Sequence, residues 1–122
     1  MTTEKFSITR RLKSFGYAFN GLKVAFISEH NLRIHLVATI AVVILGFYFK
    51  IEIVEWLILT LTIGFVIAME FLNSSIENLA DYACKEQHPL IKEVKDIAAG
   101  SVLVSAISAL IVGLLVFIPK LV

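Results

Sequence analysis

The sequence predicts an all-α membrane protein with three transmembrane helices and an N-terminal amphipathic surface helix. Hydrophobic residues make up 58% of the 122 residues, charged residues make up 17%, and the mean hydropathy is +0.87. This composition is too apolar for an ordinary soluble domain. The apolar residues also occur in long runs separated by short polar segments, which is typical of membrane-crossing helices.

The chain has the length of one domain, because 122 residues are too few for two independent hydrophobic cores. We therefore expect a single integral-membrane domain over residues 1–122. The single cysteine, Cys84, cannot form an intramolecular disulfide. The formal net charge of +1 is, as a total, uninformative. We expect no nucleic-acid partner. The expected elements are a surface helix at about residues 6–28 and spans at about residues 31–49, 54–84 and 96–118.

The N-terminal segment has the pattern of a basic amphipathic helix. Apolar residues recur at spacings of three and four, at Ile8, Leu12, Phe15, Phe19, Leu22 and Phe26. Basic residues fill other positions of the same segment. Such a helix before a membrane span tends to lie in the plane of the lipid headgroups. A helix that only anchors the chain would have the same pattern, so both interpretations stay open.

The first span contains the uncharged run at residues 36–49. As a helix this run is about 21 Å long, which is shorter than a hydrocarbon core of ~30 Å. We therefore expect the helix to begin near Asn31, with Arg33 extending toward the headgroups. The polar segment at residues 50–55 is short, so the next span must run antiparallel to the first.

The second span begins near Trp56 and is predicted to continue to about Cys84. Pro89 then ends the helical pattern, because proline lacks the backbone donor and disfavours helical geometry in the residue before it. Residues 97–118 carry no charge and form the clearest transmembrane signal. We expect Asp96 to be the N-cap of this third span and Pro119 to close it.

Basic residues are concentrated on one side of the predicted topology. They occur before and at the base of the first span and in the loop between the second and third spans, at Lys5, Arg10, Arg11, Lys13, Lys23, Arg33, Lys85, Lys92 and Lys95. The other side has only Lys50 and Lys120. The positive-inside rule therefore places the N-terminus and the second loop in the cytoplasm.

A polar stripe follows the apolar part of the second span. Glu70, Asn73, Glu77 and Asp81 are spaced by three, four and four residues, so they share one helix face, and Ser74 lies beside them. Ionisable groups at membrane depth are costly and usually face a protein interior or a water-filled cavity. The stripe is compatible with a catalytic site, a pore or proton relay, or paired structural carboxylates. Asn73 and Ser74 could also simply hydrogen-bond between helices.

The polar residues on the cytoplasmic side would suit phosphoryl transfer. Glu29 and Glu77 could bind Mg²⁺, which is often held by one or two carboxylates together with substrate phosphates. Glu70 lies deeper and is a candidate general base for a lipid hydroxyl. Positive charge and hydrogen bonds for the phosphates could come from Arg10, Lys13, Tyr17 and Lys95.

Conventional nucleotide-binding motifs do not occur in the sequence. The three histidines, His30, His35 and His88, lack metal-ligand spacing, and we interpret them as polar residues at the membrane interface.

Several segments together resemble the small bacterial integral-membrane lipid kinases, the diacylglycerol kinase and undecaprenol kinase family. They are residues 70–81 (EFLNSSIENLAD), Gly16-Tyr17, Gly21-Leu22-Lys23, Glu29 and residues 95–101 (KDIAAGS). The resemblance covers essentially the whole chain. The pieces at residues 31–35 (NLRIH), 53–56 (IVEW), 88–90 (HPL) and 117–120 (FIPK) are more similar to the undecaprenol kinase branch.

The resemblance implies a homotrimer in which neighbouring subunits share the active sites. It implies that Glu70 is the general base, that Asn73 lies close to it, and that Glu29 and Glu77 bind metal. Nucleotide contacts are implied for Arg10, Tyr17, Glu29, Glu77, Glu86, His88, Lys95 and Asp96, and substrate contacts for Arg10, Glu70 and Ala99. Two positions depart from the enterobacterial branch, which has an acidic residue at His35 and a lysine at Asn20. Both departures concern the identity of the lipid acceptor.

The resulting hypothesis is an ATP- and Mg²⁺-dependent kinase in the bacterial inner membrane that phosphorylates the hydroxyl of a membrane lipid. Undecaprenol is the first expected acceptor and diacylglycerol the second. Two alternatives belong to other classes. One is a small channel or transporter subunit with an acidic relay, and the other is a structural subunit that anchors a partner in the membrane.

Overall fold

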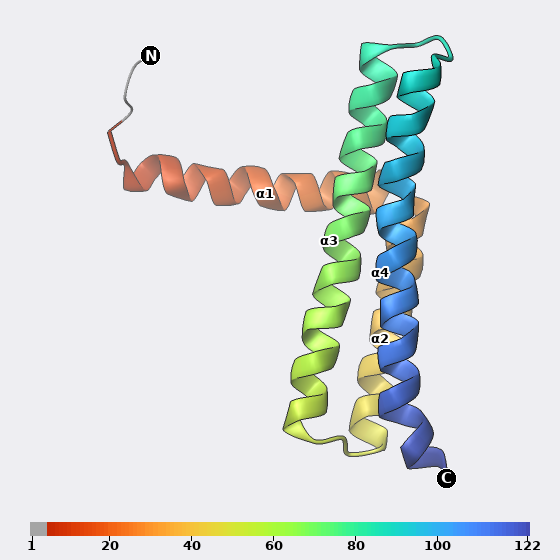
Figure 1. Ribbon diagram of the computed structural model, residues 1–122. Coiled ribbons are helices and arrows are strands. Elements are labelled where there is room, and N and C mark those ends of the chain that lie inside the picture. The colour runs from red at the N-terminus through yellow and green to blue at the C-terminus, as the bar shows by residue number, and fades with distance from the viewer. Residues whose placement is uncertain (1–4) are drawn as a thin grey trace.

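The computed structural model describes residues 5–122, and within that range it consists of helices joined by short connections (Figure 1). The helices are α1 (Ile8–Ser28), α2 (His30–Tyr48), α3 (Ile53–Ala83) and α4 (Pro89–Leu121). Three of them, α2, α3 and α4, are long and apolar enough to cross a membrane. The expected all-α fold with three candidate spans is therefore confirmed. Residues 1–4 of the expected domain lie outside the described residues.

A sharp corner separates α1 from α2. The corner is one residue, Glu29, whose backbone is extended with φ −102° and ψ 112°. Figure 1 shows α1 lying roughly at right angles to the other helices, while α3 and α4 continue past it. None of the residues of α1 is buried in the single chain. Because Glu29 forms the corner, its carboxylate is placed where α1 meets the helix bundle.

The far end of the bundle, around the α2–α3 turn, contains the apolar core. Ile51, Leu59 and Val116 are buried there, and partly buried side chains from α2, α3 and α4 pack around them. Lys120 near the end of α4 forms an ion pair of 3.2 Å with Glu55 in the first turn of α3. These contacts hold the three candidate spans together at the end opposite the polar stripe.

Close packing at this turn makes Gly46 sensitive to substitution. A Cβ atom at Gly46 would lie 2.5 Å from Cη2 of Trp56, whereas a Cβ at Gly64 would meet nothing within 4 Å. Overpacking of this kind costs about 1–3 kcal/mol. We expect Gly46→Ala to lower the thermal unfolding temperature of the detergent-solubilised protein, while Gly64→Ala leaves it within error. Equal unfolding temperatures for the two variants would show that the α2–α3 contact is not as close as described.

The long helices α3 and α4 run antiparallel and side by side (Figure 1), joined by a short loop. The helix break expected before Pro89 is confirmed, because α3 ends at Ala83 and α4 begins at Pro89. The expectation that Asp96 caps the third span is wrong. His88 is the N-cap and accepts a hydrogen bond from the Leu90 amide at 3.1 Å, while Asp96 lies inside α4 and pairs with Lys92.

The early start of α4 has a simple cause. Proline is favoured in the first turn of a helix, where its missing N–H would have no helical partner, so Pro89 begins the helix well before the charge-free stretch. At the other end α4 continues to Leu121, although Pro119 was expected to close it. The helix is about 50 Å long at 1.5 Å per residue, which exceeds a hydrocarbon core of ~30 Å. The helix is therefore longer than the hydrocarbon core requires.

Candidate active site

The polar stripe of α3 is largely buried in the single chain. Glu70 is 3% exposed, Asn73 is 8% exposed and Ser74 is 7% exposed. At 1.5 Å per residue, Glu70 lies about 26 Å from the first residue of α3, and the helix continues for about 20 Å beyond it. A hydrocarbon core of ~30 Å that starts near Ile53 would therefore end close to Glu70. Such a layer would place the Glu70 carboxylate near its edge.

Hydrogen bonds fix the side chains of this stripe. His35 Nε2 on α2 is 2.9 Å from Oε1 of Glu70. Asn73 Nδ2 donates a hydrogen bond of 3.3 Å to Oε1 of Glu77, one turn further along α3. The other amide atom, Asn73 Oδ1, is buried and has no hydrogen-bond partner within residues 5–122. A buried acceptor without a donor is unusual, so Asn73 Oδ1 is a hydrogen-bond acceptor that remains unsatisfied within the described residues.

A cavity of about 530 Å³ lies where α1 meets α3. Its lining includes Glu29 from the corner, Asn20 from α1, and Ser74 and Asn78 from α3. Phe26 and Phe71 pack edge to face beside it, with ring centroids 5.9 Å apart. The structure thus brings Glu29 next to Ser74, which lies beside the stripe, but Glu70, Asn73, Glu77 and Asp81 do not line this cavity. The pairing of Glu29 with Glu77 stays a prediction.

The side chains that could bind Mg²⁺ are the carboxylates of Glu29 and Glu77. No group of three or more His, Cys, Asp and Glu side chains within the described part of the chain could hold a metal ion by itself. Mg²⁺ is commonly held by only one or two carboxylates, with nucleotide phosphates and water completing the octahedron. Glu29 and Glu77 are both half-buried and supply the oxygen ligands that Mg²⁺ prefers. Their carboxylate oxygens are chemically suited to a cation that is shared with a nucleotide.

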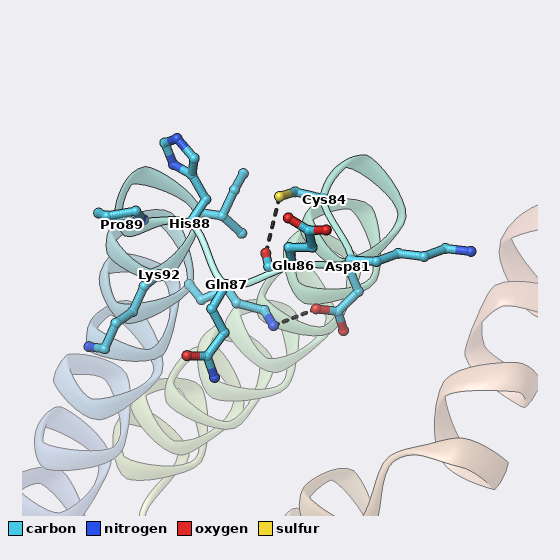
Figure 2. A pocket seen from close by; sticks show the side chains of 10 residues that line it. Asp81, Cys84, Glu86, Gln87, His88, Pro89 and Lys92 are labelled. Atoms are coloured by element: carbon cyan, nitrogen blue, oxygen red, sulfur yellow. Dashed lines mark hydrogen bonds and ion pairs between the residues drawn. The ribbon is translucent and has the colours of Figure 1, made fainter.

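A second cavity, of about 450 Å³, lies at the Asp81 end of the stripe, at the α3–α4 loop. Figure 2 shows Asp81 from α3, the C-cap residue Cys84, Glu86 and Gln87 from the loop, and His88, Pro89 and Lys92 around the start of α4. Lys95 also lines it and donates to Oδ1 of Asp81. The structure therefore brings together three predicted nucleotide contacts: Glu86, His88 and Lys95. Asp96 does not line the cavity, but its carboxylate accepts a hydrogen bond of 2.7 Å from Lys92, which does.

Arg10 and Tyr17 are placed elsewhere. Both line a cavity of about 460 Å³ on α1, together with Lys5, Phe6, Ser7, Arg11, Lys13 and Ser14. Because α1 points away from the bundle (Figure 1), this basic surface is separate from the α3–α4 loop of the same chain. Apart from Glu29 at the corner and Glu77 within α3, the predicted nucleotide contacts therefore fall into two groups, one on α1 and one around the α3–α4 loop. Ala99, the remaining predicted substrate contact, is exposed on α4.

Sequence reasoning missed two partners of the predicted residues. His35 was interpreted as an interfacial polar residue, yet it is the hydrogen-bond partner of Glu70. Asp81 was recognised as part of the stripe but not as the partner of Lys95. A usable signal exists for the first pair, because two ionisable residues at similar depth in neighbouring spans tend to pair with one another. For Asp81 and Lys95, the signal is that α3 and α4 run antiparallel around a short loop, which places oppositely charged residues on either side of the loop close together.

The sequence is similar to a family of known proteins and to several of its members. A family model described as prokaryotic diacylglycerol kinase matches residues 16–117. The chain is 42% identical to an undecaprenol kinase of Bacillus subtilis (strain 168) over 93% of each chain. It is 38% identical to a diacylglycerol kinase of Synechocystis sp., over 90% of this chain and 63% of that one. It is 31% identical to a diacylglycerol kinase of Escherichia coli (strain K12) over 91% of each chain.

The family match and the relatives extend over nearly the whole chain, including α2, α3, α4 and most of α1. The match includes Glu29, the polar stripe and the α3–α4 loop cavity. The chain belongs to the prokaryotic diacylglycerol kinase family and is a membrane lipid kinase.

Proposed function

We propose that this lipid kinase transfers the γ-phosphate of ATP to the terminal hydroxyl of undecaprenol. The observation that carries the proposal is the buried carboxylate of Glu70 on a long apolar helix that continues to a polar cavity at the α3–α4 loop. A lipid hydroxyl can approach Glu70 from the bilayer, while a nucleotide can approach from the side of the α3–α4 loop. The two substrates then meet along the polar stripe of α3.

In the proposed reaction Glu70 accepts the proton of the lipid hydroxyl as the lipid oxygen attacks the γ-phosphorus. The bond between the γ-phosphorus and the bridging oxygen breaks, ADP leaves, and the proton stays on Glu70 until it is released to solvent. Asn73 lies one turn along the same helix face, and its free Oδ1 can accept a hydrogen bond from the incoming hydroxyl. Positioning of this kind is a large part of catalysis in phosphoryl transfer.

The remaining roles concern the nucleotide. Glu29 and Glu77 would hold Mg²⁺, which neutralises charge on the phosphates when bound. Lys95, Glu86, His88 and Asp96 would contact the nucleotide from the α3–α4 loop, and Arg10 and Tyr17 would contact it from α1. Ala99 and Arg10 would contact the lipid substrate.

The separation of α1 from the loop supports a homotrimer with shared sites. In a single chain Arg10 and Tyr17 lie on a helix that points away from the bundle, so they cannot reach the loop cavity of the same chain (Figure 1). A neighbouring subunit would bring its loop and stripe to this surface. The extensive exposed apolar area of α2, α3 and α4 would then be shared between lipid and the other subunits.

The distribution of basic side chains supports an orientation with the N-terminus in the cytoplasm. The basic side chains of α1 and of the α3–α4 loop lie on one side, which the positive-inside rule places in the cytoplasm of a bacterial cell, where ATP is available. With α1 at a right angle to the spans, its apolar face can rest on the inner membrane and its cations can contact anionic headgroups. The amphipathic pattern of α1 supports this placement.

Undecaprenol is favoured over diacylglycerol by the relative with 42% identity and by the polar atoms near Glu70. The Glu70 oxygen that His35 does not contact and Asn73 Oδ1 are both hydrogen-bond acceptors. They suit an alcohol with one donor hydroxyl. Diacylglycerol also carries two ester carbonyls, which are acceptors and would need donors from the protein. Diacylglycerol is the second candidate because several relatives carry that name.

Reconstitution tests the reaction class. Purified protein in vesicles that contain undecaprenol should transfer label from γ-labelled MgATP to the lipid, and removal of Mg²⁺ by EDTA should stop the transfer. The channel alternative predicts ion conductance across the vesicle membrane without consumption of ATP. Folded protein that labels neither undecaprenol nor diacylglycerol would exclude the proposed function.

A further inference from the structure

The contact between His35 and Glu70 links two helices through one buried carboxylate. His35 Nε2 and Glu70 Oε1 are 2.9 Å apart, and the side chains are 25% and 4% exposed. Within residues 5–122, His35 is the one side chain that is hydrogen-bonded to Glu70. Within the described part of the chain, the one fixed polar contact of the carboxylate therefore comes from α2.

The direction of this hydrogen bond follows from the work required of Glu70. A general base must be ionised before it accepts a proton, and an ionised carboxylate can only accept hydrogen bonds. His35 Nε2 must then carry a hydrogen and donate it to Oε1. This donation leaves the second oxygen, Oε2, as the atom that can accept the proton of the lipid.

The hydrogen bond also restricts a torsion that is otherwise loose. The terminal torsion of glutamate has broad, roughly two-fold preferences, so an unpartnered carboxylate rotates between orientations. A base works only within hydrogen-bond reach of the proton that it abstracts, and a displacement of about 1 Å can cost about 100-fold in rate. Fixing Oε1 to α2 would hold Oε2 at a constant place relative to the lipid.

We propose that His35 is a positioning residue that holds the Glu70 carboxylate by donation from Nε2, with Oε2 directed to the lipid hydroxyl. The proposal rests on the proposed role of Glu70 as the base. The ring itself need not touch either substrate. The backbone carbonyl of His35 accepts a separate hydrogen bond of 2.7 Å from Thr39 Oγ1, so the ring can be replaced without removing that contact.

Three substitutions separate positioning from simple packing. His35→Gln places an amide N–H near the position of Nε2, His35→Asn places its amide about one bond too short, and His35→Leu removes the donor. We expect kcat to fall about 10- to 100-fold in His35→Leu and His35→Asn, and to stay within about threefold of wild type in His35→Gln. The KM for MgATP should be unchanged in all three, because the nucleotide cavity lies elsewhere. His30→Leu, on the exposed first residue of α2, is the matched control and should keep wild-type kinetics.

A spectroscopic measurement is independent of turnover. In protein labelled with ¹⁵N-histidine, Nε2 of His35 should be protonated in the wild type, and its signal should move in Glu70→Gln while those of His30 and His88 do not. If His35→Leu fails to fold, the comparison of Gln with Asn still decides the question. Wild-type kcat in folded His35→Leu, equal kcat in the Gln and Asn variants, or an unprotonated Nε2 in the wild type would overturn the positioning role. Absence of lipid phosphorylation by the wild type would instead overturn the proposed function.

Discussion

Replacement of Glu70 by glutamine is expected to reduce lipid phosphorylation by about 10³-fold or more. A general base contributes about 10²- to 10⁴-fold to a rate, and the amide of glutamine cannot accept the proton of the lipid hydroxyl. Glutamine has nearly the same shape as glutamate, and its carbonyl oxygen can still accept from His35 Nε2, 2.9 Å away in the wild type. The fold should therefore be preserved while the chemistry is lost.

The measurement is the initial rate of label transfer from MgATP to lipid in vesicles, together with the unfolding temperature and the oligomeric size in detergent. Glu93→Gln is the matched control, because Glu93 is an exposed carboxylate on the same proposed cytoplasmic side and has no assigned role. A protein that only anchors a partner would be indifferent to Glu70→Gln. Substantial lipid phosphorylation by well-folded Glu70→Gln protein would therefore remove Glu70 from the role of base.

The spans were predictable because hydropathy depends on local composition. The expected spans at 31–49 and 54–84 agree with α2 and α3 to within about a residue at each end. The prediction of the third span, at residues 96–118, was less accurate, because α4 extends from Pro89 to Leu121. The absence of charge marks the part of a helix that can lie in the bilayer, and it does not mark where the helix begins. Pro89 and His88 set the actual start of α4, and the charged first turns of the helix stand outside the charge-free stretch.

The polar contacts between helices were harder to predict. Spacing alone places Glu70, Asn73 and Glu77 on one face of α3, and the bond between Asn73 and Glu77 confirms that those two side chains are neighbours. Spacing does not give the rotation of α2 relative to α3, and that rotation decides whether His35 meets Glu70. The pair is visible only when both helices are placed.

The family could be identified from motifs, and the match over residues 16–117 confirms it. The assembly of the site could not be derived in the same way. Arg10 and Tyr17 lie on α1, whose direction depends on the one extended residue Glu29, and the sequence pattern contains no clear signal for that corner. The proposed sharing of sites between subunits accounts for this separation.

The acceptor lipid is expected to show a large difference in rate. With undecaprenol and diacylglycerol present at equal surface concentration, undecaprenol should be phosphorylated at least about tenfold faster. Buried polar groups that lack a partner typically cost about 1–3 kcal/mol each, and the two ester carbonyls of diacylglycerol are additional acceptors that would need donors from the protein. Each such mismatch corresponds to roughly tenfold or more in rate if it is present in the transition state.

The most direct test of the account is this competition in one vesicle preparation, with MgATP labelled at the γ-phosphate and both lipid products separated and counted. The account predicts that undecaprenyl phosphate carries most of the label and that Glu70→Gln removes the label from both products. Label mainly in phosphatidic acid would contradict the proposed acceptor, and label in neither product would contradict the proposed reaction.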